Sequence, residues 1–314
     1  MASRRVVSIS LGTSKRNKSS TVSLLGDEFT IERIGTDGDR TKFAQMFSDL
    51  DGKVDAIGVG GCDIWVVVGE KKYGFREILS LIKGAKSTPV VDGSGLKHTL
   101  ERHTIEHLQS SGAVDFRKER VLLMSAADRY GMAQALDKIC PEVLYGDLMF
   151  GLGLPIRVRS YAAVQRIGRV ALPIITRLPF QWFYPTGEKQ EHRTPKFQKD
   201  FDWATVIAGD SLYINRYAPD RMDNKTVITQ SVRKPNVDAL RNAGVSRLIT
   251  TTPVFGGETF ATNVMEGVLV TLLKSRGMEP NEANYQAMIA ELGWLPNVMH
   301  LQEPAPTPPQ TVEA

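Results

Sequence analysis

Short apolar runs alternate with helical stretches along almost the whole chain, and this alternation constrains the fold more than any other feature. Near-continuous apolar runs are typical of parallel strands covered on both faces, and their alternation with helices indicates mostly parallel sheets. Strands are predicted at residues 5–11, 29–35, 54–60, 89–92, 120–125, 142–146, 204–209, 226–232 and 247–252. Helices are predicted at residues 40–50, 95–110, 130–139, 236–243 and 259–275, and a hairpin at 63–74. The sequence therefore predicts an α/β fold with two mostly parallel α/β domains, the second Rossmann-like (doubly wound).

A chain of 314 residues exceeds the size at which one hydrophobic core stops growing, so two domains are expected. The small and polar segment 110–118 predicts the boundary between a domain at residues 1–115 and a domain at residues 119–300. The last helices are expected to pack back on the first domain. Residues 303–314 are rich in proline without periodicity, which predicts a disordered tail.

The composition excludes several classes of protein. The net charge of +4 is too small to favour nucleic acid as a partner. No apolar run is long enough to span a membrane, and the N-terminal residues lack a secretion signal, so a cytoplasmic location is expected. Two distant cysteines, Cys62 and Cys140, exclude a disulfide framework. His103 and His107 share a helical face without further ligands, so no metal site is expected.

The helical insert at residues 160–190 is apolar and basic, with Arg166, Arg169 and Arg177 beside apolar positions. One interpretation is an element that binds a membrane surface or a partner protein. The other is a helix that packs between the domains or across a homodimer, and this interpretation is favoured because the charges are few.

Four strand-end loops are candidate ligand sites, because parallel sheets bind ligands at the carboxyl ends of their strands. The first, Gly12–Thr21, carries Lys15, Arg16 and Lys18 and suits a phosphate or carboxylate. It lacks the Gly-Lys-Ser order of the Walker loop that binds nucleoside triphosphates. A solvated basic loop is the alternative interpretation.

The second loop lies in VVDGSGLKHTLE, residues 90–101. Its glycines and the following helix start suggest an anion site, with Asp92 and Lys97 as a proton-transfer pair. The positive end of the helix and partial burial are expected to lower the pKa of Lys97. Helix capping and a salt bridge are the alternative.

The third loop lies in RVLLMSAADRYGMAQAL, residues 120–136, before a strand that ends at Asp147. This shape resembles a dinucleotide-binding unit in which Gly131 is the third glycine, Ala126 and Asp128 replace the other two, and Asp147 takes the ribose hydroxyls. The fourth loop, in residues 247–267, presents Thr250–Thr252 and Gly256–Gly257 before a helix start near Thr259.

Stretches such as VVSISLGTSKR, TPVVDGSGLKHTLER, MSAADRYGMA and RLITTTPVFGGETFATNVMEG resemble bacterial proteins described as quinate or shikimate 5-dehydrogenases. The resemblance covers most of residues 5–275 and implies a substrate domain followed by a dinucleotide-binding domain. The chain diverges from well-established shikimate dehydrogenases, because Ser125-Ala126-Ala127-Asp128 stands where they carry a Gly-Ala-Gly-Gly turn.

The resemblance implies an oxidoreductase that uses NAD or NADP on a small polyhydroxy carboxylate such as quinate or shikimate. Lys97 is then the general acid/base, held by Asp37 or Asp63, and Asp147 favours NAD by repelling the 2′-phosphate of NADP. The residues expected to bind substrate are Ser10, Thr13, Ser14, Lys15 and Asp92. The residues expected to bind the cofactor are Ser125, Ala126, Asp128, Arg129, Gly131, Asp147, Thr251 and Thr252. The alternatives are a transferase or ligase-like enzyme on a phosphorylated substrate, and a non-catalytic nucleotide-binding partner protein.

Overall fold

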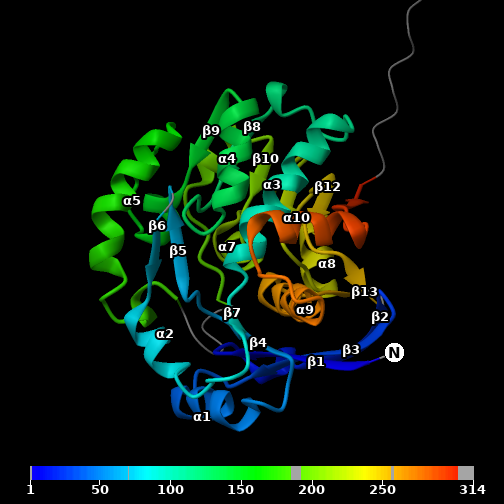
Figure 1. Ribbon diagram of the computed structural model, residues 1–314. Coiled ribbons are helices and arrows are strands. Elements are labelled where there is room, and N and C mark those ends of the chain that lie inside the picture. Colours follow the sequence, from blue (N-terminus) through cyan, green and yellow to red (C-terminus); the bar gives the residue numbers. More distant parts are fainter. Residues whose placement is uncertain (1, 70, 185–191, 256–257, 303–314) are drawn as a thin grey trace, which may run out of the picture.

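The computed structural model describes residues 2–69, 71–184, 192–255 and 258–302. It contains two mainly parallel sheets, each flanked by helices, so the predicted pair of mostly parallel α/β domains is confirmed (Figure 1). The predicted tail at 303–314 lies outside the described residues.

The first sheet has the strand order β2-β3-β1-β4-β7, and β2 alone runs antiparallel to its neighbour. Its strands are β1 (Ser3–Ser10), β2 (Lys18–Leu24), β3 (Asp27–Gly35), β4 (Ala56–Gly60) and β7 (Val90–Val91). The elements that accompany it are a 3-10 turn (Ser14–Arg16), α1 (Arg40–Leu50), α2 (Arg76–Leu81) and the predicted hairpin of β5 (Trp65–Val68) and β6 (Lys71–Gly74). Part of the predicted loop Gly12–Thr21 is therefore strand β2.

The second sheet has the order β15-β12-β11-β10-β8-β9, and β15 alone is antiparallel. Its strands are β8 (Arg120–Leu123), β9 (Glu142–Tyr145), β10 (Val206–Ala208), β11 (Thr226–Thr229), β12 (Arg247–Thr250) and β15 (Asn297–His300). Its helices are α3 (Ser94–Ser110), α4 (Tyr130–Ile139), α6 (Gln198–Trp203), α7 (Ser211–Tyr217) and α8 (Lys234–Asn242). Smaller elements are two 3-10 turns (Phe116–Lys118 and Phe180–Trp182), a π-helical turn (Asp147–Gly151), and the pair β13 (Val254–Phe255) and β14 (Glu258–Thr259).

The strand order distinguishes this fold from the predicted Rossmann-like domain. Counted within each domain, the parallel strands lie in the order 2-1-3-4 in the first sheet and 2-1-3-4-5 in the second. This is the flavodoxin-like doubly wound order, whereas the Rossmann order is 3-2-1-4-5-6. The doubly wound architecture is present, and the Rossmann order is not.

Helices α9 (Thr262–Ser275) and α10 (Glu282–Glu291) return to the first domain, as expected from the sequence. Helix α9 lies directly over the first sheet in Figure 1, and its Val264 and Val268 share a core with Val6 and Ala56. A Cβ at Gly267 would lie 2.7 Å from Val6 Cγ1, so glycine permits this close approach. The first domain is therefore completed by a segment from near the C-terminus.

Helix α5 (Tyr161–Ile175) lies within the predicted insert and packs between the domains. Its Val164 belongs to the core of the second domain, while Leu172 belongs to that of the first. The outer face exposes Val170 and Ile174. Packing between the domains is thus confirmed, and a homodimer through this helix stays a prediction. None of the described helices is long and apolar enough to cross a membrane.

Candidate functional site

A cavity of about 580 Å³ lies between the two domains at the carboxyl ends of their strands. Doubly wound sheets bind ligands where the strand order reverses, which here is between β1 and β4 and between β8 and β10. Ser10 and Gly60 end the first pair of strands, Ser125 and Asp210 follow the second pair, and all four residues line the cavity. Both switch points therefore open to one shared cavity.

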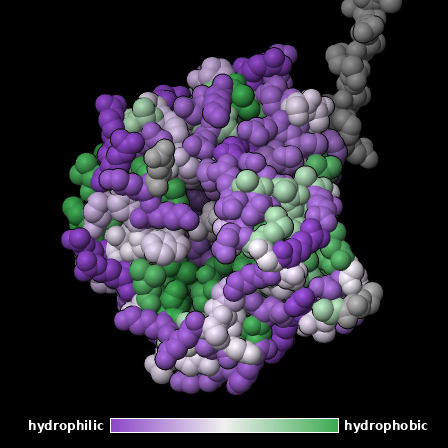
Figure 2. Space-filling view, in the orientation of Figure 1, coloured by the Kyte–Doolittle hydropathy of each residue, from purple (hydrophilic) through white to green (hydrophobic). Residues whose placement is uncertain are grey.

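The cavity has a charged side, called the charged floor below, that is formed by Lys97, Arg129 and their carboxylate partners. Another side is apolar and is called the apolar wall. The apolar wall includes Val66 and Phe75 of the first domain together with Leu172 and Ile175 of α5. On the face drawn in Figure 2, hydrophobic side chains gather in the lower half and hydrophilic side chains cover most of the rest. Such a mixture of apolar surface and a few convergent polar groups is typical of small-molecule sites.

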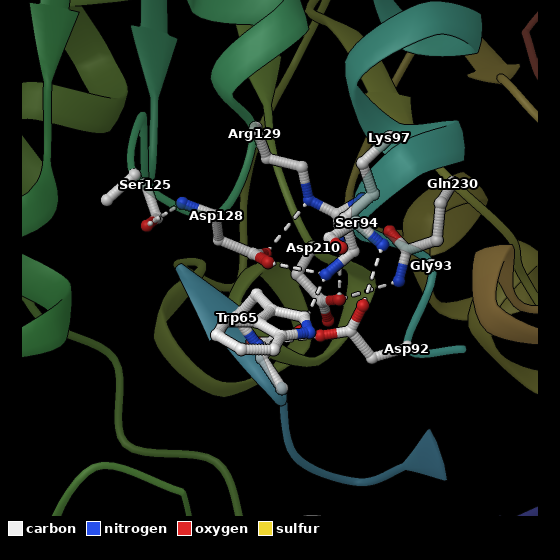
Figure 3. A network of polar contacts seen from close by, with 12 residues as sticks. Trp65, Asp92, Gly93, Ser94, Lys97, Ser125, Asp128, Arg129, Asp210 and Gln230 are labelled. Atoms are coloured by element: carbon white, nitrogen blue, oxygen red, sulfur yellow. Dashed lines mark hydrogen bonds and ion pairs between the residues drawn. The ribbon is translucent and has the colours of Figure 1, made fainter. Parts of the chain in front are cut away.

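Lys97 is at the centre of the charged floor (Figure 3). Its Nζ donates to Asp63 Oδ1 at 2.7 Å and to Asp128 Oδ1 at 2.6 Å. Asp63 follows β4, Lys97 lies in the first turns of α3, and Asp128 precedes α4. Tyr184 donates its hydroxyl to the second oxygen of Asp63 at 2.7 Å. One ammonium group thus fixes two carboxylates that come from separate segments of the chain.

Arg129 is buried beside Asp128 and joins two further carboxylates to this network. Its guanidinium donates to Asp210 Oδ2 at 2.6 Å and to Glu101, and its Nε lies 3.0 Å from Asp128 Oδ2. Gln230 donates to the same oxygen of Asp210 at 2.7 Å. Because Arg129 is 1% exposed, it positions the carboxylates rather than meeting a ligand directly.

The network contains more acidic than basic groups, since Lys97 and Arg129 face Asp63, Asp128, Asp210 and Glu101. Burial raises the pKa of Asp63 to about 6 and the pKa of Glu101 to about 7. Burial also acts to raise the pKa of Asp128, but Arg129 and Lys97 lower it by more, to about 2. Two of the four carboxyl groups therefore retain protons to higher pH than an exposed carboxyl group would.

Lys97 does not have the lowered pKa expected from the sequence. Burial acts to lower its pKa, but the carboxylates of Asp128 and Asp63 raise it by more, so the net pKa is well above its ordinary value. A lysine that stays charged near neutral pH is a poor proton-transfer group. The geometry favours Lys97 as a fixed cation that orients carboxylates.

Asp92 stabilises the backbone next to Asp63 and at the start of α3. Its Oδ2 accepts from the amides of Ile64 at 2.7 Å and Trp65 at 2.8 Å, and its Oδ1 accepts from the amide of Ser94 at 3.0 Å. These bonds fix the turn that carries Asp63. The predicted Asp92–Lys97 pair is therefore replaced by a direct Lys97–Asp63 pair.

The predicted anion site at the start of α3 is already filled by the chain. Glu266 of α9 accepts from the amides of Gly93 at 2.6 Å and Gly95 at 3.2 Å, and from the hydroxyl of Tyr285 at 3.1 Å. A Cβ at Gly95 would lie 2.4 Å from Glu266 Oε1, which explains the glycine there.

The predicted dinucleotide loop is filled in the same way. Asp147 accepts from the amides of Ala126 at 3.0 Å and Ala127 at 2.9 Å, so the groups expected to bind pyrophosphate hold a carboxylate instead. A Cβ at Gly131 would lie 2.1 Å from the carbonyl oxygen of His98. Gly131 therefore serves the close packing of α4 on α3, and this loop offers no dinucleotide site.

The residues predicted for the site divide into those that line the cavity and those that do not. Those that line the cavity are Ser10, Lys15, Asp63, Asp92, Lys97, Ser125, Asp128, Arg129 and Asp147. The described residues that were predicted for the site but do not line it are Thr13, Ser14, Asp37, Ala126, Gly131, Thr251 and Thr252. Asp37 lies apart from Lys97 and accepts from the amide of Ser14 at 2.6 Å. The predicted Gly256–Gly257 turn lies outside the described residues.

Sequence reasoning missed several residues of the site. Asp210 directly follows the predicted strand 204–209, so inspection of every strand end would have found it. Gln230 lies inside the predicted strand 226–232 and follows β11 only because that strand ends earlier, at Thr229. Tyr184 also lines the cavity, but no sequence pattern distinguishes it. Asn263, which belongs to the predicted segment 247–267, lines the cavity too and donates to Ser8 at 2.7 Å. Within the described ranges, no group of three His, Cys, Asp or Glu side chains could hold a metal ion.

Two family models match the chain. A model described as domain of unknown function DUF8754 covers residues 95–301, and one described as domain of unknown function DUF8753 covers residues 5–92. The chain belongs to the DUF8754 family. The two models meet between residues 92 and 95, whereas the boundary predicted at 110–118 stays a prediction.

No curated protein matches the sequence. A solute-binding protein of an ABC transporter from Agrobacterium vitis, with bound allitol, is 12% identical with a TM-score of 0.38, covering 92% of this chain and 99% of its own. GanP, a glucose-galactose binding protein from Geobacillus stearothermophilus, is 9% identical with a TM-score of 0.35, covering 96% and 99%. Likeness at these scores is too weak to establish a shared fold or ligand.

These findings overturn the dehydrogenase interpretation. The matching family models describe domains of unknown function rather than quinate or shikimate dehydrogenases. The predicted resemblance to these dehydrogenases, the predicted oxidoreductase activity and the predicted NAD or NADP cofactor are therefore wrong. The physical reason is that Asp147 already holds the loop amides on which the cofactor site was based. The cytoplasmic location stays a prediction.

Proposed function

We propose that the protein binds a small polyhydroxylated molecule in the cavity between its two domains, without chemical conversion. The observation that carries this proposal is the shared cavity, in which fixed donors and acceptors from both domains converge at two sheet switch points. Its volume of about 580 Å³ suits a small molecule.

The polar groups match the chemistry of a hydroxyl, which both donates and accepts hydrogen bonds. The carboxylates of Asp128 and Asp210 supply acceptors, and Lys97 and Gln230 supply donors. Each group is held by a neighbour before any ligand arrives, so little conformational entropy is lost on binding.

The apolar wall completes the fit. Phe75 and Leu172 offer a surface for the C–H groups of a polyol or sugar, which alternate with its hydroxyls. The raised pKa of Lys97 supports binding rather than catalysis, because this lysine retains its proton.

Calorimetric titration of purified protein with a panel of polyols, monosaccharides, sugar acids and sugar phosphates tests the proposal. At least one should bind, and Asp210→Asn should weaken it about tenfold or more, because a charge-assisted hydrogen bond is lost. Asparagine can still cap α7, where Asp210 accepts from the amide of Leu212 at 2.7 Å. Asp49→Asn on the surface helix α1 is the control and should bind like the wild type. Failure of the whole panel, or equal binding by both variants, would contradict the proposal.

A further inference from the structure

A second set of basic side chains lines the cavity, in addition to Lys97 and Arg129. Arg16, Lys18 and Arg33 come from the first domain, Arg233 comes from the segment before α8, and all four line the cavity. The cluster therefore draws like charges from both domains to one place.

Backbone geometry shows that these cations are neighbours. Lys18 and Arg33 are paired directly opposite one another in the register of β2 and β3. Lys18 Nζ donates to the carbonyl oxygen of Thr259 at 2.7 Å, and Thr259 Oγ1 accepts from the amide of Val232 at 2.9 Å. Arg233 is the next residue along the chain, so the second domain places its cation beside those of the first.

Arg33 is fixed at the centre of the cluster. Its guanidinium donates to Ser10 Oγ at 2.9 Å and to the carbonyl oxygen of Thr13 at 3.1 Å. Burial lowers its pKa to about 10, with further lowering by Arg16 and Arg233 and a smaller opposing effect of Asp37. Arg16 and Arg233 therefore lie close enough to Arg33 to act on its charge.

Guanidinium groups that line one cavity hold an anionic group by charge-assisted hydrogen bonds. We propose that Arg16, Arg33 and Arg233 form an anion subsite that binds the phosphate or carboxylate group of the polyhydroxylated ligand. This inference rests on the proposed function, because it specifies one end of the same ligand.

The anion subsite and the carboxylates near Lys97 then have separate roles. The anion subsite orients the ligand by its charged group, and the carboxylates near Lys97 receive its hydroxyls. Guanidinium groups suit this role, since they form two parallel hydrogen bonds to a phosphate or carboxylate. Because the subsite draws residues from both domains, a bound anion would also link them.

Matched ligands that differ only in charge test the subsite: sorbitol, gluconate and sorbitol 6-phosphate, titrated calorimetrically at about 0.1 M and about 1 M salt. An anionic ligand should bind the wild type at least about tenfold more tightly than sorbitol, and salt should reduce this advantage. The double variant Arg16→Gln/Arg233→Gln should lose the advantage and bind sorbitol normally. Both substitutions spare Arg33, whose hydrogen bonds support the loop.

Arg221→Gln, which removes an exposed arginine paired with Asp223, is the matched control and should keep the advantage. The stronger of the two anionic ligands identifies the group as phosphate or carboxylate. Equal binding of sorbitol and both anions to the wild type would overturn the subsite while the proposed function stands. An unchanged advantage in the double variant would also overturn it.

Inorganic phosphate separates failure of the subsite from failure of the proposed function. It should raise the Tm of the wild type and leave that of the double variant unchanged. If no polyol binds but this difference is found, the proposed function is wrong and the anion subsite stands. If neither a polyol nor inorganic phosphate binds, both are wrong.

Discussion

Lys97 Nζ lies 2.6 Å from Asp128 Oδ1, and this ion pair joins the first turns of α3 to the loop before α4. The same ammonium group contacts Asp63 at 2.7 Å. Both buried carboxylates therefore depend on this ammonium group for charge compensation, and Asp128 is compensated by Arg129 as well.

The first prediction is that Lys97→Met strongly destabilises the protein. Removal of one partner from a buried pair leaves an uncompensated charge and costs about 3–5 kcal/mol. Urea denaturation near pH 8 should show this loss in the free energy of unfolding. Lys83→Met, which removes an exposed lysine, should change it little.

A second substitution makes the test specific to the pair. Asp128→Asn in the Lys97→Met background should cost much less than Asp128→Asn alone, because its partner is already gone. Additive losses would show that the two side chains do not interact.

The alternation of strands and helices predicted most of the architecture, because apolar periodicity depends on local sequence. It missed β2, whose sequence KSSTVSL is largely polar and half exposed at a sheet edge, and the short β15. Strand order was not predictable in the same way, since the 2-1-3-4-5 order depends on long-range pairing.

The site was predictable in part for the same reason. Lys97 and Asp128 each belong to a strand-end loop selected from the sequence, and Asp63 was expected to hold Lys97. Their contact depends on how closely α3 and α4 approach, and no local pattern reports that distance. Asp147 shows why a sequence motif alone does not establish a binding site. The strand–turn–helix shape was predicted correctly, but the Asp147 carboxylate accepts hydrogen bonds from the loop amides that were expected to bind a cofactor.

The second prediction concerns Gly131, where α4 passes closest to α3. Alanine in a helix is ordinarily favoured over glycine by up to about 1 kcal/mol. Here the added Cβ would lie 2.1 Å from the backbone oxygen of His98, so Gly131→Ala should instead cost about 1–3 kcal/mol. Thermal and urea denaturation measure the sign of the change directly.

Gly151→Ala is the matched control, because a Cβ there meets nothing within 4 Å. It should leave the free energy of unfolding nearly unchanged. A stabilising effect of Gly131→Ala would show that the two helices pack less closely than in the structure.

The third prediction is that the free energy of unfolding falls as pH rises from about 5 to about 8. Burial raises the pKa of Asp63 to about 6 and the pKa values of Glu101 and Glu266 to about 7. In this range the folded protein binds protons that the unfolded chain has released. The stabilisation is therefore complete below the unfolded pKa values, near 4, and is lost as pH rises through 6 to 7.

Asp128 does not cancel this trend, because its pKa is lowered to about 2 and its contribution changes only in more acidic solution. The expected fall is on the order of 3 kcal/mol, measured by urea denaturation across the range. Glu101→Gln should reduce the fall, because glutamine stays neutral at every pH. Glu106→Gln removes an exposed carboxylate from the same helix and should preserve it. A free energy of unfolding that stays level or rises with pH would show that these buried carboxyl groups are ionised throughout.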